Sequence, residues 1–142
     1  KQFSNCDIAI FSAAVSDFKP KQIIKEKIKQ KSIVINTEPN LDIIKELSVK
    51  KKNQFIVGFA LETENEEENA IKKMKQKNMD LIVLNSLKDQ GACFEHDTNK
   101  VKIIDKDLSV KNYPLMEKSE VASLILDEIL FKRNYYSSIK EV

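Results

Sequence analysis

Two near-continuous apolar runs, QFIVGFAL at residues 54–61 and DLIVLN at 80–85, place the strongest constraint on the fold of this chain. Runs of this kind are typical of strands covered on both faces, as in parallel sheets. Between them, glutamates precede lysines along residues 63–77, in the order that stabilises a helix through its dipole. Thr63 and Glu66 match a capping box at the start of that helix. The segment therefore predicts two parallel strands joined by a right-handed helical crossover.

Two more strands and a helix are predicted upstream of this unit. The sequence DIAIFSAAV at 7–15 predicts a buried strand, and SIVINTE at 32–38 predicts a second strand with alternating isoleucines. Pro39 and Asn40 interrupt the pattern, and apolar residues at helical spacing then predict a helix near 41–52. The alternation of strands and helices thus begins close to the start of the chain.

Downstream, a polar loop at 86–99 precedes two short apolar segments. The sequences KVKII and LSVKNY flank DKD within residues 100–113 and predict an antiparallel hairpin. Ser119 is the expected cap of a final helix, and the tail is expected to fray from Asn134. Because no linker divides the 142 residues, we expect a single domain spanning 1–142. The predicted fold class is α/β: a three-layer Rossmann-like sandwich with a mostly parallel sheet and an antiparallel hairpin near the C-terminal end.

Composition argues against several classes of function. The formal net charge is +2 and Arg133 is the only arginine, so the sequence predicts no nucleic-acid partner. No apolar stretch approaches about 20 residues, which predicts no membrane span. Cys6 and Cys93 are far apart, and with a single histidine they give no metal-ligand spacing. Free thiols in a reducing compartment are expected, which favours a cytoplasmic location.

Polar side chains follow several of the predicted strands, at the sheet edge where α/β proteins bind ligands. Lysines neutralise phosphate charge and a carboxylate can hold Mg²⁺, so acids, amides and lysines at this edge suit a nucleoside triphosphate. For each acid the alternative is a turn or helix-capping role, as for Asp42 at a predicted helix start. The polar residues of these loops include Asp17, Asn40, Asp42, Glu62 and Asn85.

The chain has only two glycines, Gly58 and Gly91. Neither G-x-G-x-x-G nor a P-loop can be written on it, which argues against a nicotinamide-cofactor Rossmann enzyme. Phosphates would instead rest on lysines and helix N-termini, or on a glycine-rich segment upstream of Lys1.

Six segments occur in a fixed order: SAAVSDFKP, KEKIKQ, PNLDII, VGFALETEN, KNMDLIVLN and F-x-x-D-T-N. Together they resemble the phosphopantothenate–cysteine ligase domain, the C-terminal part of a bifunctional bacterial flavoprotein of coenzyme A biosynthesis, from about Cys6 to Ile129. The resemblance implies CTP-dependent ligation of 4'-phosphopantothenate and cysteine through an acyl-cytidylate, with Mg²⁺ as cofactor. It also implies a homodimer, and FMN only if a decarboxylase domain is fused upstream. The chain departs from the family at Gln30, where the K-x-K-K pattern has lysine, and at Cys93 and Glu95, where glycines are usual.

The resemblance also implies roles for individual residues. Lys27 would take a catalytic role from a mobile flap at 21–31, and Asp17 would be the acid on the ribose or metal side of the nucleotide. Lys73 and Lys77 would bind phosphate, and their spacing of four places both on one face of a helix. The implied nucleotide-binding residues are Phe11, Ser12, Ala13, Asp17, Lys27, Leu41, Asp42, Ile43, Ile44, Phe59, Lys73 and Lys77.

Three questions stay open on the sequence alone. The chain is expected to lack the family's N-terminal glycine-rich portion, so a non-catalytic nucleotide-binding or dimerisation module is the alternative to an active ligase. The sequence does not predict whether CTP or ATP is preferred, because backbone groups are expected to select the base. A dimer is expected through sheet edges and the hairpin at 100–113, where Val101, Ile103 and Val110 would otherwise be exposed.

Overall fold

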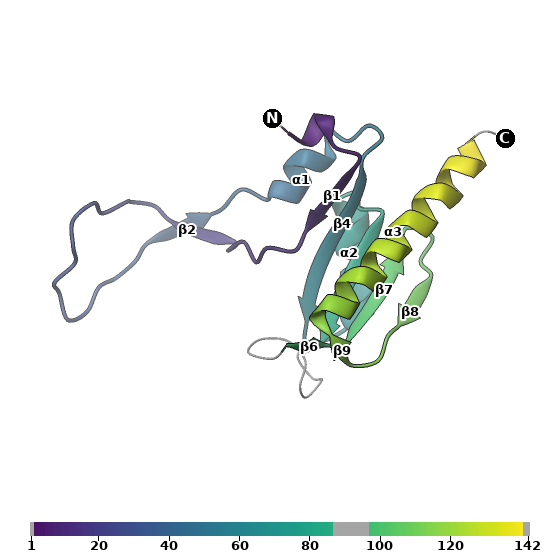
Figure 1. The fold of residues 1–142 in the computed structure, drawn as a ribbon. Coiled ribbons are helices and arrows are strands. Elements are labelled where there is room, and N and C mark those ends of the chain that lie inside the picture. The colour runs from purple at the N-terminus through teal and green to yellow at the C-terminus, as the bar shows by residue number, and fades with distance from the viewer. Residues whose placement is uncertain (1, 87–96, 141–142) are drawn as a thin grey trace.

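A five-stranded sheet forms the centre of the molecule in a computed structural model, which describes residues 2–86 and 97–140 (Figure 1). The strands are β1 (Ile8–Phe11), β4 (Phe55–Glu62), β5 (Leu81–Ser86), β7 (Val101–Asp105) and β8 (Val110–Asn112). Their order in the sheet is β1-β4-β5-β7-β8. The first three run parallel, whereas β7 is antiparallel to both β5 and β8. The predicted α/β class is confirmed, but the sheet is mixed rather than mostly parallel, because the predicted hairpin joins it through β7, which is antiparallel to β5 as well as to β8.

Helices cover both faces of this sheet, which gives three layers (Figure 1). α1 (Ile43–Ser48) and α2 (Glu66–Gln76) lie on one face, and α3 (Lys118–Lys140) lies on the other. Successive side chains of a strand point to opposite faces. In β4, Ile56 therefore packs in the core beneath α1 and α2, whereas Val57 packs in the core beneath α3. Burial on both faces explains the apolar runs, and the predicted strands at these positions are confirmed.

Residues 18–39 form an arm that leaves the body of the molecule (Figure 1). Its base is an antiparallel pairing of β2 (Phe18–Pro20) with β3 (Thr37–Pro39). The predicted strand at 32–38 is therefore wrong except at its end, and Val34 is 90% exposed. A strand pattern is realised only where a neighbouring strand and a buried face exist, and within residues 2–86 and 97–140 no strand pairs with the outer arm.

β1 is also shorter and less buried than predicted. It ends at Phe11 rather than at Val15, and Ile10 is 42% exposed. Among the described strands, β1 lies at an edge of the sheet and pairs with β4 alone, so its apolar run is covered less completely than that of a central strand.

Two helix boundaries before β5 differ from the prediction. α1 ends at Ser48, several residues before the predicted end of this helix. α2 is preceded by Asn65, whose backbone is left-handed with φ 45° and whose side chain makes no capping hydrogen bond. The predicted capping box of Thr63 and Glu66 is therefore wrong, since the chain turns at Asn65 to enter the helix.

The final helix also differs at both ends from the prediction. α3 begins at Lys118, so Ser119 lies inside the helix and is not its cap. The helix continues beyond Asn134, where fraying was expected. The hydroxyl of Tyr136 donates a hydrogen bond to Asp107 Oδ2 at 2.8 Å, and this contact with the turn after β7 holds the last part of the helix.

The predicted hairpin is present as β7 and β8, but its expected exposure is wrong. Val101 and Ile103 are only 1% and 3% exposed, because β7 lies between β5 and β8 and faces α3. Val110, on the edge strand β8, is half-buried. A separate small sheet pairs β6 (Thr98–Asn99) with β9 (Met116–Glu117) next to the start of α3 (Figure 1).

Cys6, which follows a short 3-10 helix (Phe3–Asn5), is a free thiol. Cys93 and most of the predicted loop at 86–99 lie outside the described residues. Within the described ranges, no helix is long and apolar enough to cross a bilayer.

Candidate functional site

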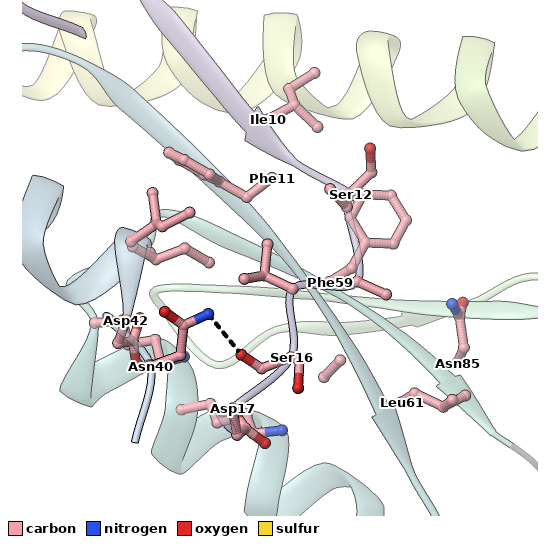
Figure 2. A pocket seen from close by; sticks show the side chains of 18 of the residues that line it. Ile10, Phe11, Ser12, Ser16, Asp17, Asn40, Asp42, Phe59, Leu61 and Asn85 are labelled. Atoms are coloured by element: carbon pink, nitrogen blue, oxygen red, sulfur yellow. Dashed lines mark hydrogen bonds and ion pairs between the residues drawn. The ribbon is translucent and has the colours of Figure 1, made fainter. Parts of the chain in front are cut away.

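A pocket of about 880 Å³ opens where β1, β4 and β5 reach their carboxyl ends (Figure 2). This is the edge at which α/β sheets bind ligands, and the volume lies within the range of small-molecule sites. Three parts of the chain that are distant in sequence form most of its wall. They are the segment that follows β1, the segment that leads from β3 into α1, and the end of α2 with the neighbouring part of β4.

The pocket brings together most of the residues that the family resemblance implies. Lys27 is the exception, because it lies on the exposed arm and does not line the pocket. The predicted residues that line the pocket are Phe11, Ser12, Ala13, Asp17, Leu41, Asp42, Ile43, Ile44, Phe59, Lys73 and Lys77.

Lys73 and Lys77 approach the pocket from α2 and its C-terminal end, on the common face that their spacing predicts. Each ammonium group is held by one carboxylate. Lys73 Nζ lies 2.7 Å from Glu62 Oε1, and Lys77 Nζ lies 2.9 Å from Asp42 Oδ2. An ammonium group has three donors, so each lysine keeps donors for an anionic ligand while its carboxylate partner fixes its direction.

Asp42 has two structural roles at the pocket wall. Its Oδ1 accepts a hydrogen bond from the backbone N of Lys45 at 3.1 Å and caps α1, as the alternative reading of this acid predicted. Burial alone would raise the pKa of the Asp42 carboxyl. The hydrogen bond from Lys45 and the charge of Lys77 outweigh burial, so the pKa lies below its ordinary value. The carboxylate is therefore charged at neutral pH and holds Lys77 against the start of α1.

Aromatic side chains line another part of the pocket (Figure 2). Phe11 at the end of β1 and Phe59 in β4 are both half-buried, and each packs against one of the two cores. Leu61 is 37% exposed and extends this apolar surface. A pocket with aromatic side chains on its wall and two lysines from one helix is suited to a ligand with a planar part and a phosphate-bearing part.

Asp17 is the residue that was predicted to hold Mg²⁺, and it lines the pocket. Among residues 2–86 and 97–140, no group of three or more His, Cys, Asp or Glu side chains could hold a metal ion. Nucleotide-bound Mg²⁺ generally needs only one or two carboxylates, because phosphate oxygens and waters complete its octahedron. A single carboxylate at Asp17 therefore fits an ion that arrives with a nucleotide.

Sequence reasoning did not assign Asn99 and Lys118 to the site. Both line the pocket, and Asn99 Nδ2 donates a hydrogen bond to Asn85 Oδ1 at 3.2 Å. Asn99 is the last residue of the F-x-x-D-T-N segment, which contributed to the family resemblance but did not predict that Asn99 would line the pocket. The pairing of β6 with β9 returns this part of the chain to the carboxyl end of β5, and periodicity cannot predict such a pairing. Other lining residues that were not among the implied set are Ile10, Ala14, Val15, Ser16, Asn40, Ala60, Leu61 and Asn85.

Fold and pocket together define an α/β domain with a pocket beyond the carboxyl ends of its parallel strands, where lysines pair with carboxylates. Comparison with known protein families places it more closely: residues 1–132 match the family described as DNA/pantothenate metabolism flavoprotein C-terminal domain. The chain belongs to this family, which is the phosphopantothenate–cysteine ligase part of the bifunctional protein CoaBC.

Two curated relatives illustrate the similarity. The Coenzyme A biosynthesis bifunctional protein CoaBC of Bacillus subtilis (strain 168) is 46% identical over 125 residues, which cover 87% of this chain and 31% of the relative. A protein of an unknown prokaryotic organism, named Cysteine/Cysteine sulfinic acid decarboxylase, is 53% identical over 131 residues, which cover 90% of this chain and 36% of that protein. The chain thus spans about a third of the length of these relatives.

Two solved structures have a similar fold. The crystal structure of the C-terminal domain of CoaBC has a TM-score of 0.73 and 39% identity, and the match covers 92% of this chain and 59% of that one. A Cab2 mutant in complex with phosphopantothenate-cysteine has a TM-score of 0.66 over 94% of this chain and 46% of that one. Its identity is 17%, so the second likeness concerns the fold alone.

Proposed function

We propose that this chain supplies the nucleotide site of an enzyme that ligates 4'-phosphopantothenate to cysteine at the expense of CTP. The observation that carries the proposal is the pocket: residues that the family resemblance implies, from segments distant in sequence, converge on one cavity. Membership of the CoaBC family supports the same reaction.

The proposed reaction has two steps. A carboxylate oxygen of 4'-phosphopantothenate attacks the α-phosphorus of CTP, and the bond to the β-phosphate breaks, which gives an acyl-cytidylate and pyrophosphate. The amine of cysteine then attacks the acyl carbon, loses a proton and displaces CMP. The first step requires neutralisation of phosphate charge, which Lys73 and Lys77 are placed to provide. Mg²⁺, held by Asp17 and the phosphates, would add Lewis-acid stabilisation of the same charge.

Replacing either Lys73 or Lys77 with alanine should weaken CTP binding by about 1–3 kcal/mol, the scale of a lost hydrogen bond to a charged group. Titration calorimetry on the full-length gene product, with CTP and ATP and with or without Mg²⁺, measures this loss and the nucleotide preference. Lys72→Ala is the matched control, because Lys72 lies on the same helix but is exposed and does not line the pocket. Unchanged affinity in both pocket variants would contradict the proposal, and binding without turnover would favour the alternative of a non-catalytic nucleotide-binding module.

We also propose that the protein is a homodimer, as the family resemblance implies. The hairpin offers little apolar surface for this, because Val101 and Ile103 are buried. Apolar side chains of the arm are more exposed, with Ile23 at 89% and Val34 at 90%, and association would cover them. Light scattering of the full-length gene product at micromolar concentration should give the mass of a dimer. The mass of one protomer would contradict this expectation.

A further inference from the structure

Asn40 connects two of the segments that form the pocket (Figure 2). Its backbone N donates a hydrogen bond to the carbonyl oxygen of Asp17 at 2.7 Å. Its side-chain Nδ2 donates to the carbonyl oxygen of Ser16 at 3.0 Å, and its Oδ1 accepts from the backbone N of Leu41 at 2.9 Å. One residue thus ties the segment after β1 to the segment that enters α1.

These hydrogen bonds lie at the root of the arm. β2 begins at Phe18, directly after Asp17, and β3 ends at Pro39, directly before Asn40. Phe18 and Pro39 are paired in the ladder. Away from the arm the two segments separate: the residues before Asp17 lead back to β1, and the residues after Asn40 lead into α1. The direction of the arm and the shape of the pocket wall therefore both depend on the contact between residues 16–17 and Asn40.

The side chain at this position must combine a donor and an acceptor on one short planar group, and asparagine has both. Aspartate would keep the acceptor for Leu41 but would place a carboxylate against the carbonyl oxygen of Ser16. Both polar atoms of Asn40 are engaged with the backbone, so its side chain holds the two segments in place whether or not its remaining donor also meets a ligand.

We propose that Asn40 is a positioning residue that fixes the segment of Asp17 against the segment of Asp42 and thereby couples the arm to the nucleotide pocket. The identity of the nucleotide rests on the proposed function, whereas the coupling rests on the hydrogen bonds. A movement that brings Lys27 towards the pocket must pivot beside this connection. Asn40 would keep the pocket walls in place during that movement.

The test compares Asn40→Asp with Asn36→Asp in the full-length gene product. Asn36 lies on the same arm and is exposed, so the control makes the same change of charge away from the connection. The first readout is amide hydrogen exchange of residue 40 without any nucleotide. Its exchange is expected to rise about tenfold in Asn40→Asp, since one neighbouring hydrogen bond is lost and a repulsive contact replaces it. No such rise is expected at residue 40 in Asn36→Asp.

The second readout concerns the ligand. CTP affinity is expected to fall about tenfold in Asn40→Asp and to remain that of the wild type in Asn36→Asp. The ratio of CMP released to cysteine product formed should also rise, because an arm with a misplaced root protects the acyl-cytidylate from water less well. A loss of global stability alone would change neither affinity per folded molecule nor this ratio. If Asn40→Asp does not fold, Asn40→Ser, which is neutral and lacks the amide donor, is measured with the same expectations.

Wild-type exchange at residue 40 together with wild-type CTP affinity in the Asn40 variant would overturn the proposal. Equal losses of affinity in Asn40→Asp and Asn36→Asp would also overturn it, because charge on the arm would then be sufficient. If the wild-type protein does not bind CTP, the proposed function fails, and the exchange readout decides the role of Asn40 on its own.

Discussion

Replacement of Lys27 by glutamine is expected to leave the release of pyrophosphate in the first turnover intact and to stop formation of the cysteine product. Lys27 lies on the exposed arm and outside the pocket, so under the proposed function neither CTP binding nor the first step should require it. Both ends of the arm join pocket-lining segments, at Asp17 and at Asn40. Movement of the arm about this root would carry the Lys27 ammonium group over the acyl-cytidylate.

At that position the ammonium group would stabilise negative charge on the acyl oxygen as the amine of cysteine attacks, and the closed arm would exclude water. Loss of one such charge-stabilising group typically lowers the rate by about 10²–10³-fold. The measurement is made on the full-length gene product, with pyrophosphate, acyl-cytidylate and final product followed separately. Acyl-cytidylate should accumulate in Lys27→Gln.

Lys25→Gln is the matched control, because Lys25 is also an exposed lysine on the same arm. It should form product at the wild-type rate. Loss of pyrophosphate release together with product in Lys27→Gln would place Lys27 in the first step. Normal product formation would make Lys27 a surface residue with no role in the reaction.

Replacement of Lys132 by methionine is expected to reduce the free energy of unfolding by about 3–5 kcal/mol, the usual cost of removing one partner of a buried ion pair. Lys132 in α3 pairs with Asp105 at the end of β7, and their side chains are only 12% and 4% exposed. Asp105 Oδ1 also accepts hydrogen bonds from the backbone N atoms of Asp107 and Ser109, at 2.9 and 3.0 Å. Without Lys132, the carboxylate would keep these two donors but would lose its countercharge.

Lys50→Met is the matched control for this prediction, because Lys50 is exposed and the same change of side chain there removes no buried charge pair. Chemical denaturation of the chain, followed by circular dichroism, measures both variants. A loss below about 1 kcal/mol in Lys132→Met, typical of solvent-exposed pairs, would show that water screens Asp105 effectively.

The central part of the fold could be predicted from the sequence because its signals are local. The apolar runs of β4 and β5 predict burial on both faces of these strands. The glutamates at the start of α2 and the lysines at its end predict a helix between them. The spacing of Lys73 and Lys77 placed both on the face that the structure turns towards the pocket. The ends of the predicted strands also placed Asp17, Asn40, Asp42 and Asn85 at this edge of the sheet. Phe11, Leu41 and Phe59 were implied by family resemblance alone, since no spacing within the chain indicates that they meet.

The tertiary structure decided which segments with a strand pattern joined the sheet. The isoleucines at 33 and 35 alternate like those of a strand, but among the described residues no strand pairs with this part of the arm, and the two side chains are 43% and 59% exposed. Periodicity records which side chains could be buried together, and a partner elsewhere in the chain determines whether they are.

The sequence by itself therefore determined the α/β class, the two central strands, the helix between them and the hairpin that follows. The three-dimensional contacts decided the mixed sheet, the protruding arm and the completion of the pocket by Asn99 and Lys118. These features depend on hydrogen bonds between distant segments, such as that from Asn40 Nδ2 to the carbonyl oxygen of Ser16. Such bonds leave no periodic trace in the sequence, because a single side chain makes them and its partner is a backbone atom that every residue possesses.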